Sequence, residues 1–223
     1  MCGRYVSPDD AAIERFFHVG GPRDNPFRRL FNASPTMRLP VYRLHPERGR
    51  EVVRLHWGLI PSWTKETAIG ARMINARAET LTQKPAFRTA FRRRRCLVPM
   101  LGFYEWQKVA SRKVPYYVHP LKSELFAAAG LYEYWPGTNG TEPVESYTII
   151  TTDANETMVK LHDRMPVILH EHNYEAWLDP KNENTDALQK LLRPYPAEEM
   201  RAYPVSPRVN NVKNEGPELI EPV

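Results

Sequence analysis

The sequence predicts an α+β protein with a mostly antiparallel, barrel-like β centre flanked by short helices. Three observations support this fold class. Successive strand-like stretches fill residues 96–152, and amphipathic helix-like stretches lie on both sides of them. The 21 prolines, about 9% of the chain against a usual ~5%, are scattered, which is typical of many short strands and rigid turns. No repeat or clear linker interrupts the chain, so we expect a single domain over residues 1–223.

The first half of the chain predicts two helices and one strand. Residues 7–17, "SPDDAAIERFF", form a helix that Ser7 or Asp9 can cap, and a basic loop follows to about residue 30. A strand is expected over residues 52–57. Residues 84–95 predict a helix with Pro85 near its start and four arginines, 92–95, at its end. We expect that arginine run to be a solvated helix end.

The second half predicts the sheet. Four strands are expected at residues 96–108, 114–119, 124–135 and 146–152, followed by an amphipathic helix over residues 185–193. In "GFYEWQ", alternation places Phe103 and Glu105 on one face and Tyr104 and Trp106 on the other.

Charge and cysteine content restrict the class of protein. The net charge of +5 weakly favours a polyanionic partner such as nucleic acid. Cys2 and Cys96 make neither a disulfide framework nor a zinc site, which indicates a reducing compartment. The start lacks the regions of a signal peptide, and no apolar run approaches the ~18–20 residues of a membrane span. We therefore expect a cytoplasmic protein without a metal or an organic cofactor.

The opening "MCGRY" places a cysteine at position 2, where it can hardly contribute to a core. If Met1 is removed, Cys2 carries a free α-amine beside a thiol. The reference pKa of an α-amine is about 7.7–8.0, so part of it is neutral at physiological pH and can attack a carbonyl. With an aldehyde, such as the open sugar of an abasic site, the amine gives an imine and the thiol closes a thiazolidine ring. Alternatively, Cys2 is a tolerated small residue in a frayed terminus.

Two further residues are candidates for proton transfer. Glu105 lies among aromatic residues, and burial would raise its pKa into the range of a general acid or base. The alternative is a solvent-facing glutamate on an edge strand. His162, in "KLHDRMP", has the side chain whose pKa suits proton shuttling at neutral pH, although a lone histidine is more often structural.

Two stretches are candidates for DNA contact. In an extended "INARAET", Asn75, Arg77 and Glu79 project the same way, and the amide and guanidinium could grip a sugar and a phosphate. The alternative is a polar network in which Glu79 pairs with Arg77. Trp57 and Trp63, in "HWGLIPSW", either stack on unpaired bases or belong to the core.

Taken in order, "MCGR", "NARAET", "GFYEW", "HDRMP" and "PVSPRVNNVKN" resemble the SOS-response-associated peptidase (SRAP) family, also known as abasic-site-processing proteins. The resemblance covers residues 2–214. It implies a compact α+β domain whose groove takes single-stranded DNA or a junction of single and double strand. It further implies that Cys2, after Met1 is removed, forms a covalent thiazolidine link to an abasic site and shields the lesion. Lyase chemistry at the imine stage and self-removal of Met1 belong to the same picture.

The resemblance also implies residue roles. Asn75 would position the lesion sugar, Glu105 would donate and accept protons, and His162 would assist sugar opening. The positions that would contact DNA or support the site are Arg4, Trp63, Arg77, Thr151, Ser206 and Lys213. The stretch "PSWT" has one tryptophan where some relatives have two in a row, and the end soon after "VKN" favours the bacterial type.

Two other functions remain open at this point. One is a thiol peptidase that acts on other proteins, with His162 as its base. The other is a DNA-binding protein without catalysis, in which Cys2 has no role. For the cross-linking function, we expect a monomer that joins the nucleoid when it is bound to damaged DNA.

Overall fold

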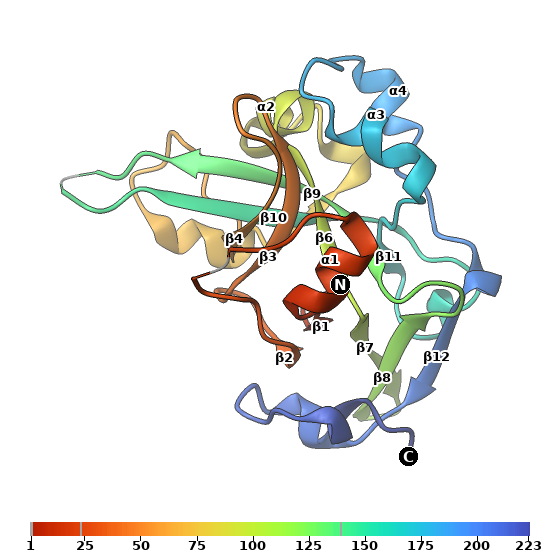
Figure 1. Cartoon of the computed structure of the whole chain (residues 1–223). Helices are drawn as coiled ribbons and strands as arrows, with labels where there is room; N and C mark the ends of the chain where they lie inside the picture. The colour runs from red at the N-terminus through yellow and green to blue at the C-terminus, as the bar shows by residue number, and fades with distance from the viewer. Residues whose placement is uncertain (1, 23, 139) are drawn as a thin grey trace.

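The structure, a computed structural model, describes residues 2–22, 24–138 and 140–223 (Figure 1). It confirms the predicted fold class: an α+β domain with a mostly antiparallel, barrel-like β centre and a few short helices around it. The strands form two sheets, and each sheet carries candidate site residues.

Five strands close the barrel. In order around the ring they are β4 (Gly49–Trp57), β3 (Arg38–His45), β6 (Arg95–Met100), β9 (Phe126–Trp135) and β10 (Val144–Asp153). Neighbouring strands are antiparallel, except that β10 and β4 pair in parallel and complete the ring. Because side chains alternate across a strand, every second residue points inward. The resulting interior cluster includes Leu39, Val41, Leu55, Trp57, Cys96, Val98, Tyr147 and Ile149.

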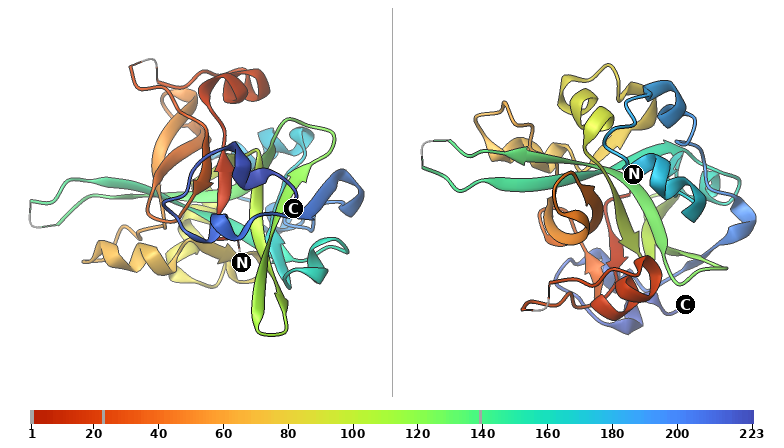
Figure 2. Two further views of the ribbon diagram at one scale, coloured as in Figure 1. Left: turned by 90° about the horizontal axis from the view of Figure 1, so that it is seen from below. Right: turned by 45° about the horizontal axis from the view of Figure 1, so that its top comes forward.

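The second sheet has the order β12 (Met200–Pro204), β8 (Arg112–Pro120), β7 (Gly102–Val109), β1 (Tyr5–Ser7) and β2 (Leu30–Ala33). The β7–β8 hairpin projects from the body in one direction and the β9–β10 hairpin in another (Figure 2, left). Two short strands, β5 (Asn75–Arg77) and β11 (Arg164–Pro166), pair with β10. The second sheet is joined to the barrel core by Tyr5, whose hydroxyl lies 2.8 Å from the Tyr147 hydroxyl.

The helices pack on the outer face of the barrel. They are α1 (Asp10–Phe17), α2 (Pro85–Arg93), α3 (Tyr174–Leu178) and α4 (Thr185–Gln189). The predicted cap of α1 is confirmed, because the Ala12 amide donates to Asp9 Oδ1 at 2.9 Å. Apolar side chains of all four helices share one cluster with the outward residues of the barrel strands. Among the residues that the structure describes, no helix has the length and apolar character that a membrane crossing requires.

The stretch 96–108, predicted as one strand, is two strands in two different sheets. β6 ends at Met100 in the barrel, and β7 begins at Gly102 in the second sheet. Glycine is required at the crossing, because a Cβ on Gly102 would lie 2.5 Å from the Tyr117 hydroxyl oxygen and 2.5 Å from the Val118 carbonyl oxygen. The chain passes between the sheets here, which places Glu105 in the second sheet.

The prediction that residues 92–95 form a solvated helix end is wrong for Arg95. α2 ends at Arg93, and Arg95 begins β6 with only 2% of its surface exposed. Burial lowers the pKa of this guanidinium to about 10, so it stays charged at neutral pH. Carbonyl groups at the ends of helices need donors, and Arg95 supplies them from one side chain. It donates to the carbonyl oxygens of Phe91, Arg92, Trp177, Asp179 and Asn182.

We predict that Arg95→Ala lowers the free energy of unfolding by about 3–5 kcal/mol, because several buried carbonyls lose their donor at once. The matched control is Arg92→Ala in the same run, whose side chain is 59% exposed and should cost no more than about 0.5 kcal/mol. Denaturant unfolding of both variants measures the difference. Equal, small losses would show that Arg95 does not hold the two helix ends together.

Candidate active site

Cys2 is fully buried, which corrects the expectation that residue 2 contributes little to a core. It belongs to the interior cluster together with Tyr5 and Phe103. Its carbonyl oxygen accepts a hydrogen bond of 2.9 Å from Asn75 Nδ2. Burial, with a smaller contribution from the negative charge of Glu105, raises the pKa of the Cys2 thiol to about 12. Met1 lies outside the described residues, and its removal stays a prediction.

Asn75 and Arg77 lie on β5, which pairs in parallel with β10; Asn75 is opposite Ile149 and Arg77 is opposite Thr151. Asn75 Oδ1 and Thr151 Oγ1 are both buried without a hydrogen-bond partner among the described residues. Buried polar atoms in native proteins normally have partners, so the two unsatisfied oxygens mark Asn75 and Thr151 as candidate contacts for a polar ligand. Arg77, in contrast, is exposed.

Glu105 and His162, both predicted from the sequence as candidates for proton transfer, line one pocket of about 530 Å³. The fold brings them together from distant parts of the chain. Glu105 is only 4% exposed, and its Oε1 accepts the Trp106 amide at 3.2 Å. This excludes the alternative of a solvent-facing glutamate. The remaining residues of the pocket are Trp106, Lys108, Lys113, Leu161 and Asn210.

The two contacts of His162 Nδ1 depend on where the imidazole proton is. Nδ1 lies 2.7 Å from Asp163 Oδ1 and 3.0 Å from the Arg164 amide nitrogen. A ring with its proton on Nδ1 donates to Asp163, whereas a ring without it accepts from Arg164. Either neighbour therefore fixes the orientation of the ring, and the tautomer decides which of the two hydrogen bonds forms.

Glu79 pairs with Arg164, which corrects the alternative in which it pairs with Arg77. Arg164 Nη1 and Nη2 lie 2.8 and 2.9 Å from the two Glu79 oxygens, in a bidentate pair. Nη2 also donates to the Thr151 carbonyl at 2.7 Å, and Nη1 to Asp153 at 3.0 Å. Arg164 thus ties the segment after β5 to β10.

The C-terminal motif is held against the second sheet by Arg4 and Asn32. Arg4 Nη1 donates to Asn32 Oδ1 at 2.6 Å and to the Val209 carbonyl at 2.8 Å. Asn32 Nδ2 donates to the carbonyls of Asn211 and Asn214 at 3.0 and 2.9 Å. Part of Arg4 is therefore occupied within the fold, so its predicted role at the site includes support of this motif.

Ser206 and Lys213 lie on that motif in different settings. The Ser206 hydroxyl accepts the Arg208 amide at 3.3 Å and caps a short 3₁₀ helix, Pro207–Asn210. Lys213 is exposed. The motif reaches the pocket through Asn210, whose Oδ1 accepts from Trp106 Nε1 at 2.7 Å.

Of the two tryptophans of "HWGLIPSW", one belongs to the core and the other is exposed. Trp57 is fully buried in the barrel and belongs to the core. Trp63 is 63% exposed and is available for stacking on a base. It does not line the Glu105–His162 pocket.

Two site residues were missed in the sequence, Asn32 and Asn210. Asparagine is unfavourable within a strand, so its presence between Phe31 and Ala33 was the available signal for a structural hydrogen-bonding role. Asn210 lies within the quoted motif "PVSPRVNNVKN", but nothing in the pattern indicates which strand it contacts. In the described part of the chain, no group of three or more His, Cys, Asp or Glu side chains is arranged to hold a metal ion.

Comparison with known proteins establishes the family. The model of the family described as SOS response associated peptidase (SRAP) matches residues 1–212. The chain belongs to the SRAP family. Its SRAP relatives include YoqW of Bacillus subtilis (strain 168), an abasic site processing protein that is 44% identical over 99% of both chains. The abasic site processing protein HMCES of Gallus gallus is 34% identical over 90% of this chain and 68% of its own length.

Solved structures share the SRAP fold seen here. A crystal structure of a protein from Bacteroides thetaiotaomicron covers 100% of both chains with a TM-score of 0.89 and 26% identity. A second, from Bordetella bronchiseptica, has a TM-score of 0.79 and 26% identity, and covers 92% of this chain and 100% of its own. The resemblance inferred from the five motifs is confirmed.

We predict that the Cys2 thiol of the Met1-containing chain reacts with iodoacetamide at a rate that rises from pH 7 toward about pH 12, without a plateau near pH 9. The raised pKa keeps most of the thiol protonated below pH 12, and because only the thiolate reacts, the rate rises with the thiolate fraction. Glu105→Gln should move the profile to lower pH, because it removes a negative charge close to the sulfur. A Cys96→Ala background restricts the signal to Cys2, and a plateau near pH 9 would contradict the environment described.

Proposed function

We propose that the protein recognises abasic sites in single-stranded DNA, or at junctions of single and double strand, and links itself to them covalently through Cys2. Membership of the SRAP family and relatives named abasic site processing proteins support DNA as the partner. The observation that carries the proposal is the position of Cys2. The Cys2 carbonyl accepts a hydrogen bond from Asn75. The charge of Glu105 acts on the Cys2 thiol, and Glu105 also lines a pocket together with His162.

The proposed reaction begins once Met1 has been removed. The α-amine of Cys2 attacks C1′ of the ring-opened sugar, and loss of water gives an imine. The Cys2 sulfur then adds to the imine carbon while the thiol proton passes to nitrogen. The product is a thiazolidine, and water is the only by-product. At the imine stage, loss of a proton from C2′ can instead expel the 3′ phosphate, which is the lyase reaction.

Each neighbouring side chain supports one part of this sequence. Asn75 Oδ1, which is buried and unpartnered among the described residues, can accept a hydroxyl of the lesion sugar. Glu105 can take the proton from the amine or thiol and return it to the leaving oxygen, and His162 can assist ring opening. Self-removal of Met1 is proposed to supply the peptidase character.

DNA binding is proposed to use contacts that carry no base code, since an aldehyde is recognised by chemistry instead of by sequence. Exposed Trp63 can stack on a base, and exposed Arg77 and Lys213 can pair with phosphates. Thr151, Arg4 and Ser206 are proposed to support the site from within the fold. We propose a monomer that acts in the cytoplasm and on the nucleoid when DNA is damaged.

A thiol peptidase that acts on other proteins is the less favoured function. Such enzymes need a cysteine whose pKa is lowered, commonly by a neighbouring histidine. Burial and Glu105 instead raise the pKa of Cys2. This environment disfavours a thiolate nucleophile and favours an amine that reacts first.

We predict that the mature protein forms an adduct with single-stranded DNA containing one abasic site, and that the adduct survives denaturing electrophoresis. The same oligonucleotide without the lesion should give none. Cys2→Ser keeps the amine and should form an imine that borohydride traps, but no stable linkage, because the oxygen cannot replace sulfur in the ring. An equally durable adduct from Cys2→Ser would overturn thiazolidine formation.

We predict that Glu105→Gln slows single-turnover cross-linking by about 10²-fold or more, since general acid–base catalysis contributes about 10²–10⁴-fold. The affinity for undamaged DNA should stay unchanged, because glutamine keeps the size of the side chain and its acceptor for the Trp106 amide. Fluorescence anisotropy measures binding and gel densitometry measures rate. Lost affinity with a normal rate per bound complex would contradict the proton-transfer role.

A further inference from the structure

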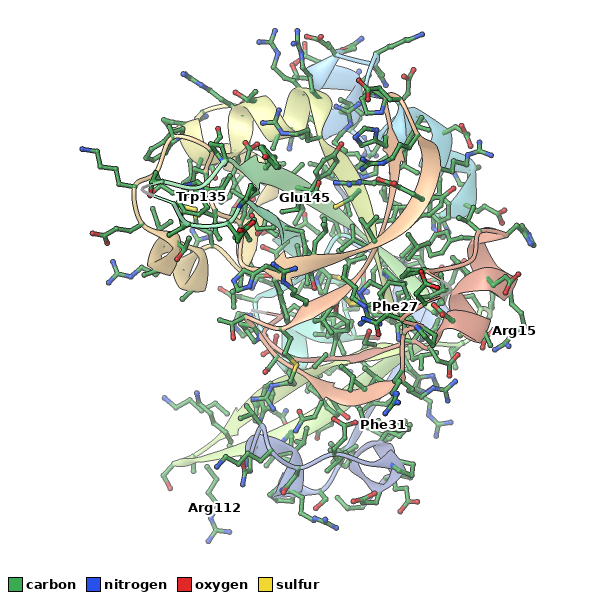
Figure 3. The ribbon with its side chains drawn as sticks, turned by 60° about the vertical axis from the view of Figure 1, so that its left-hand side comes forward. Arg15, Phe27, Phe31, Arg112, Trp135 and Glu145 are labelled. Atoms are coloured by element: carbon green, nitrogen blue, oxygen red, sulfur yellow. The ribbon has the colours of Figure 1, made fainter. Side chains whose placement is uncertain are left out.

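A second, larger pocket of about 880 Å³ lies between two hairpins of the barrel. Within the described residues, β10 pairs with β4 at Ser146↔His56 and Tyr147↔Trp57, and beyond these pairs the β3–β4 and β9–β10 hairpins diverge. Figure 3 shows Glu145 on the β9–β10 hairpin close to the β3–β4 strands, where Arg43 Nη1 meets it at 2.5 Å. The pocket has no lining residue in common with the Glu105–His162 pocket.

The lining of this pocket is strongly basic. Six cationic side chains and two carboxylates, Glu145 and Glu183, line it, and two further carboxylates outside the lining, Glu51 and Glu133, pair with two of the cations. The cations are Arg38, Arg48, Arg54, Arg93, Arg94 and Lys181. Positive charge therefore exceeds negative charge in the lining of this pocket, and the field there attracts anions.

Half of these cations are not neutralised by the fold. Arg48, Arg93 and Arg94 pair with glutamates at 2.9, 2.9 and 2.6 Å. In the part of the chain that the structure describes, no carboxylate lies within ion-pair distance of Arg38, Arg54 or Lys181.

Arg54 is nevertheless held in place, although it has no anionic partner among the described residues. Its Nη2 donates to the carbonyls of Asn25 and Pro26, both at 2.8 Å, and its guanidinium lies over the Phe27 ring. A cation fixed by neutral groups keeps its charge available for a ligand, and its side-chain entropy has already been lost on folding.

The arrangement fits an extended chain of phosphates better than a single phosphate. The cations come from five separate segments: β3, the β3–β4 turn, β4, the end of α2 and the segment after α3. Tyr134, half exposed in the same lining, offers a ring for a base or sugar.

We propose that this pocket binds the phosphate backbone of DNA at a distance from Cys2, as a second contact that retains the strand flanking the lesion. The choice of DNA as the polyanion rests on the proposed function. The existence of the pocket and its positive charge are independent of that function. Phosphate contacts of this kind position a protein without reading sequence.

The test compares two double variants that remove the same charge. Arg38→Ala with Lys181→Ala removes two unpaired cations from the pocket, and Arg88→Ala with Lys190→Ala removes two exposed cations outside both pockets. Anisotropy over a salt series uses undamaged single-stranded oligonucleotides of roughly 6 and roughly 30 nucleotides. Because the DNA is undamaged, this test is separate from the lesion chemistry. The lesion chemistry is measured in parallel, as cross-linking to a short oligonucleotide with an abasic site.

The pocket variant should reduce the salt dependence of binding to the long oligonucleotide by about 0.7 per lost phosphate contact, about 1.4 in total. Its binding and cross-linking of the short oligonucleotide should match the wild type, and the control variant should bind both lengths normally. Equal losses in both variants, or unchanged binding of long DNA by the pocket variant, would overturn the proposal. Calorimetry gives one more outcome that would overturn it: pyrophosphate binds the wild type and not the pocket variant, while long DNA binds both proteins equally.

Discussion

The site depends on how tightly the second residue of the chain is fixed. Chain termini are usually frayed, yet β1 begins three residues after Cys2 and pairs with β2 on one side and β7 on the other. Asn75 then holds the Cys2 carbonyl. The backbone nitrogen of Cys2 is therefore positioned by folding, before any substrate arrives. In the proposed reaction, this prior positioning of the nucleophile lowers the entropic part of the activation free energy.

In the proposed reaction, burial of the Cys2 thiol sets the order of the two bond-forming steps. The thiol has a pKa of about 12 in this environment, whereas an α-amine has a reference pKa of about 7.7–8.0. At neutral pH the amine is the group with a reactive fraction, and the thiol still holds its proton. In the proposed reaction the imine therefore forms first, and sulfur adds later and delivers that proton to nitrogen. The negative charge of Glu105 favours this order, because it also raises the pKa of the Cys2 thiol.

Local patterns in the sequence predicted the α+β class, the cap of α1 and the strands β8, β9 and β10, because these features are set by neighbouring residues. The five motifs predicted the family. Closure of the barrel, the division of residues 96–108 and the strands β1, β2 and β3 depend on partners far along the chain. The burial of Cys2 and Arg95, and the pairing of Glu79 with Arg164, have the same origin. Each is decided by a residue distant in the sequence or by the packing of two sheets, which no local period encodes.

The central claim is that residue 2 reacts through both its amine and its sulfur. Mass spectrometry of the adduct with abasic single-stranded DNA, intact and after proteolysis, tests it most directly. The expected result is a chain without Met1 that carries the sugar remnant on its first residue, Cys2, with both nitrogen and sulfur blocked to alkylation. An active chain that retains Met1, or a remnant on a lysine or any other side chain, would contradict it.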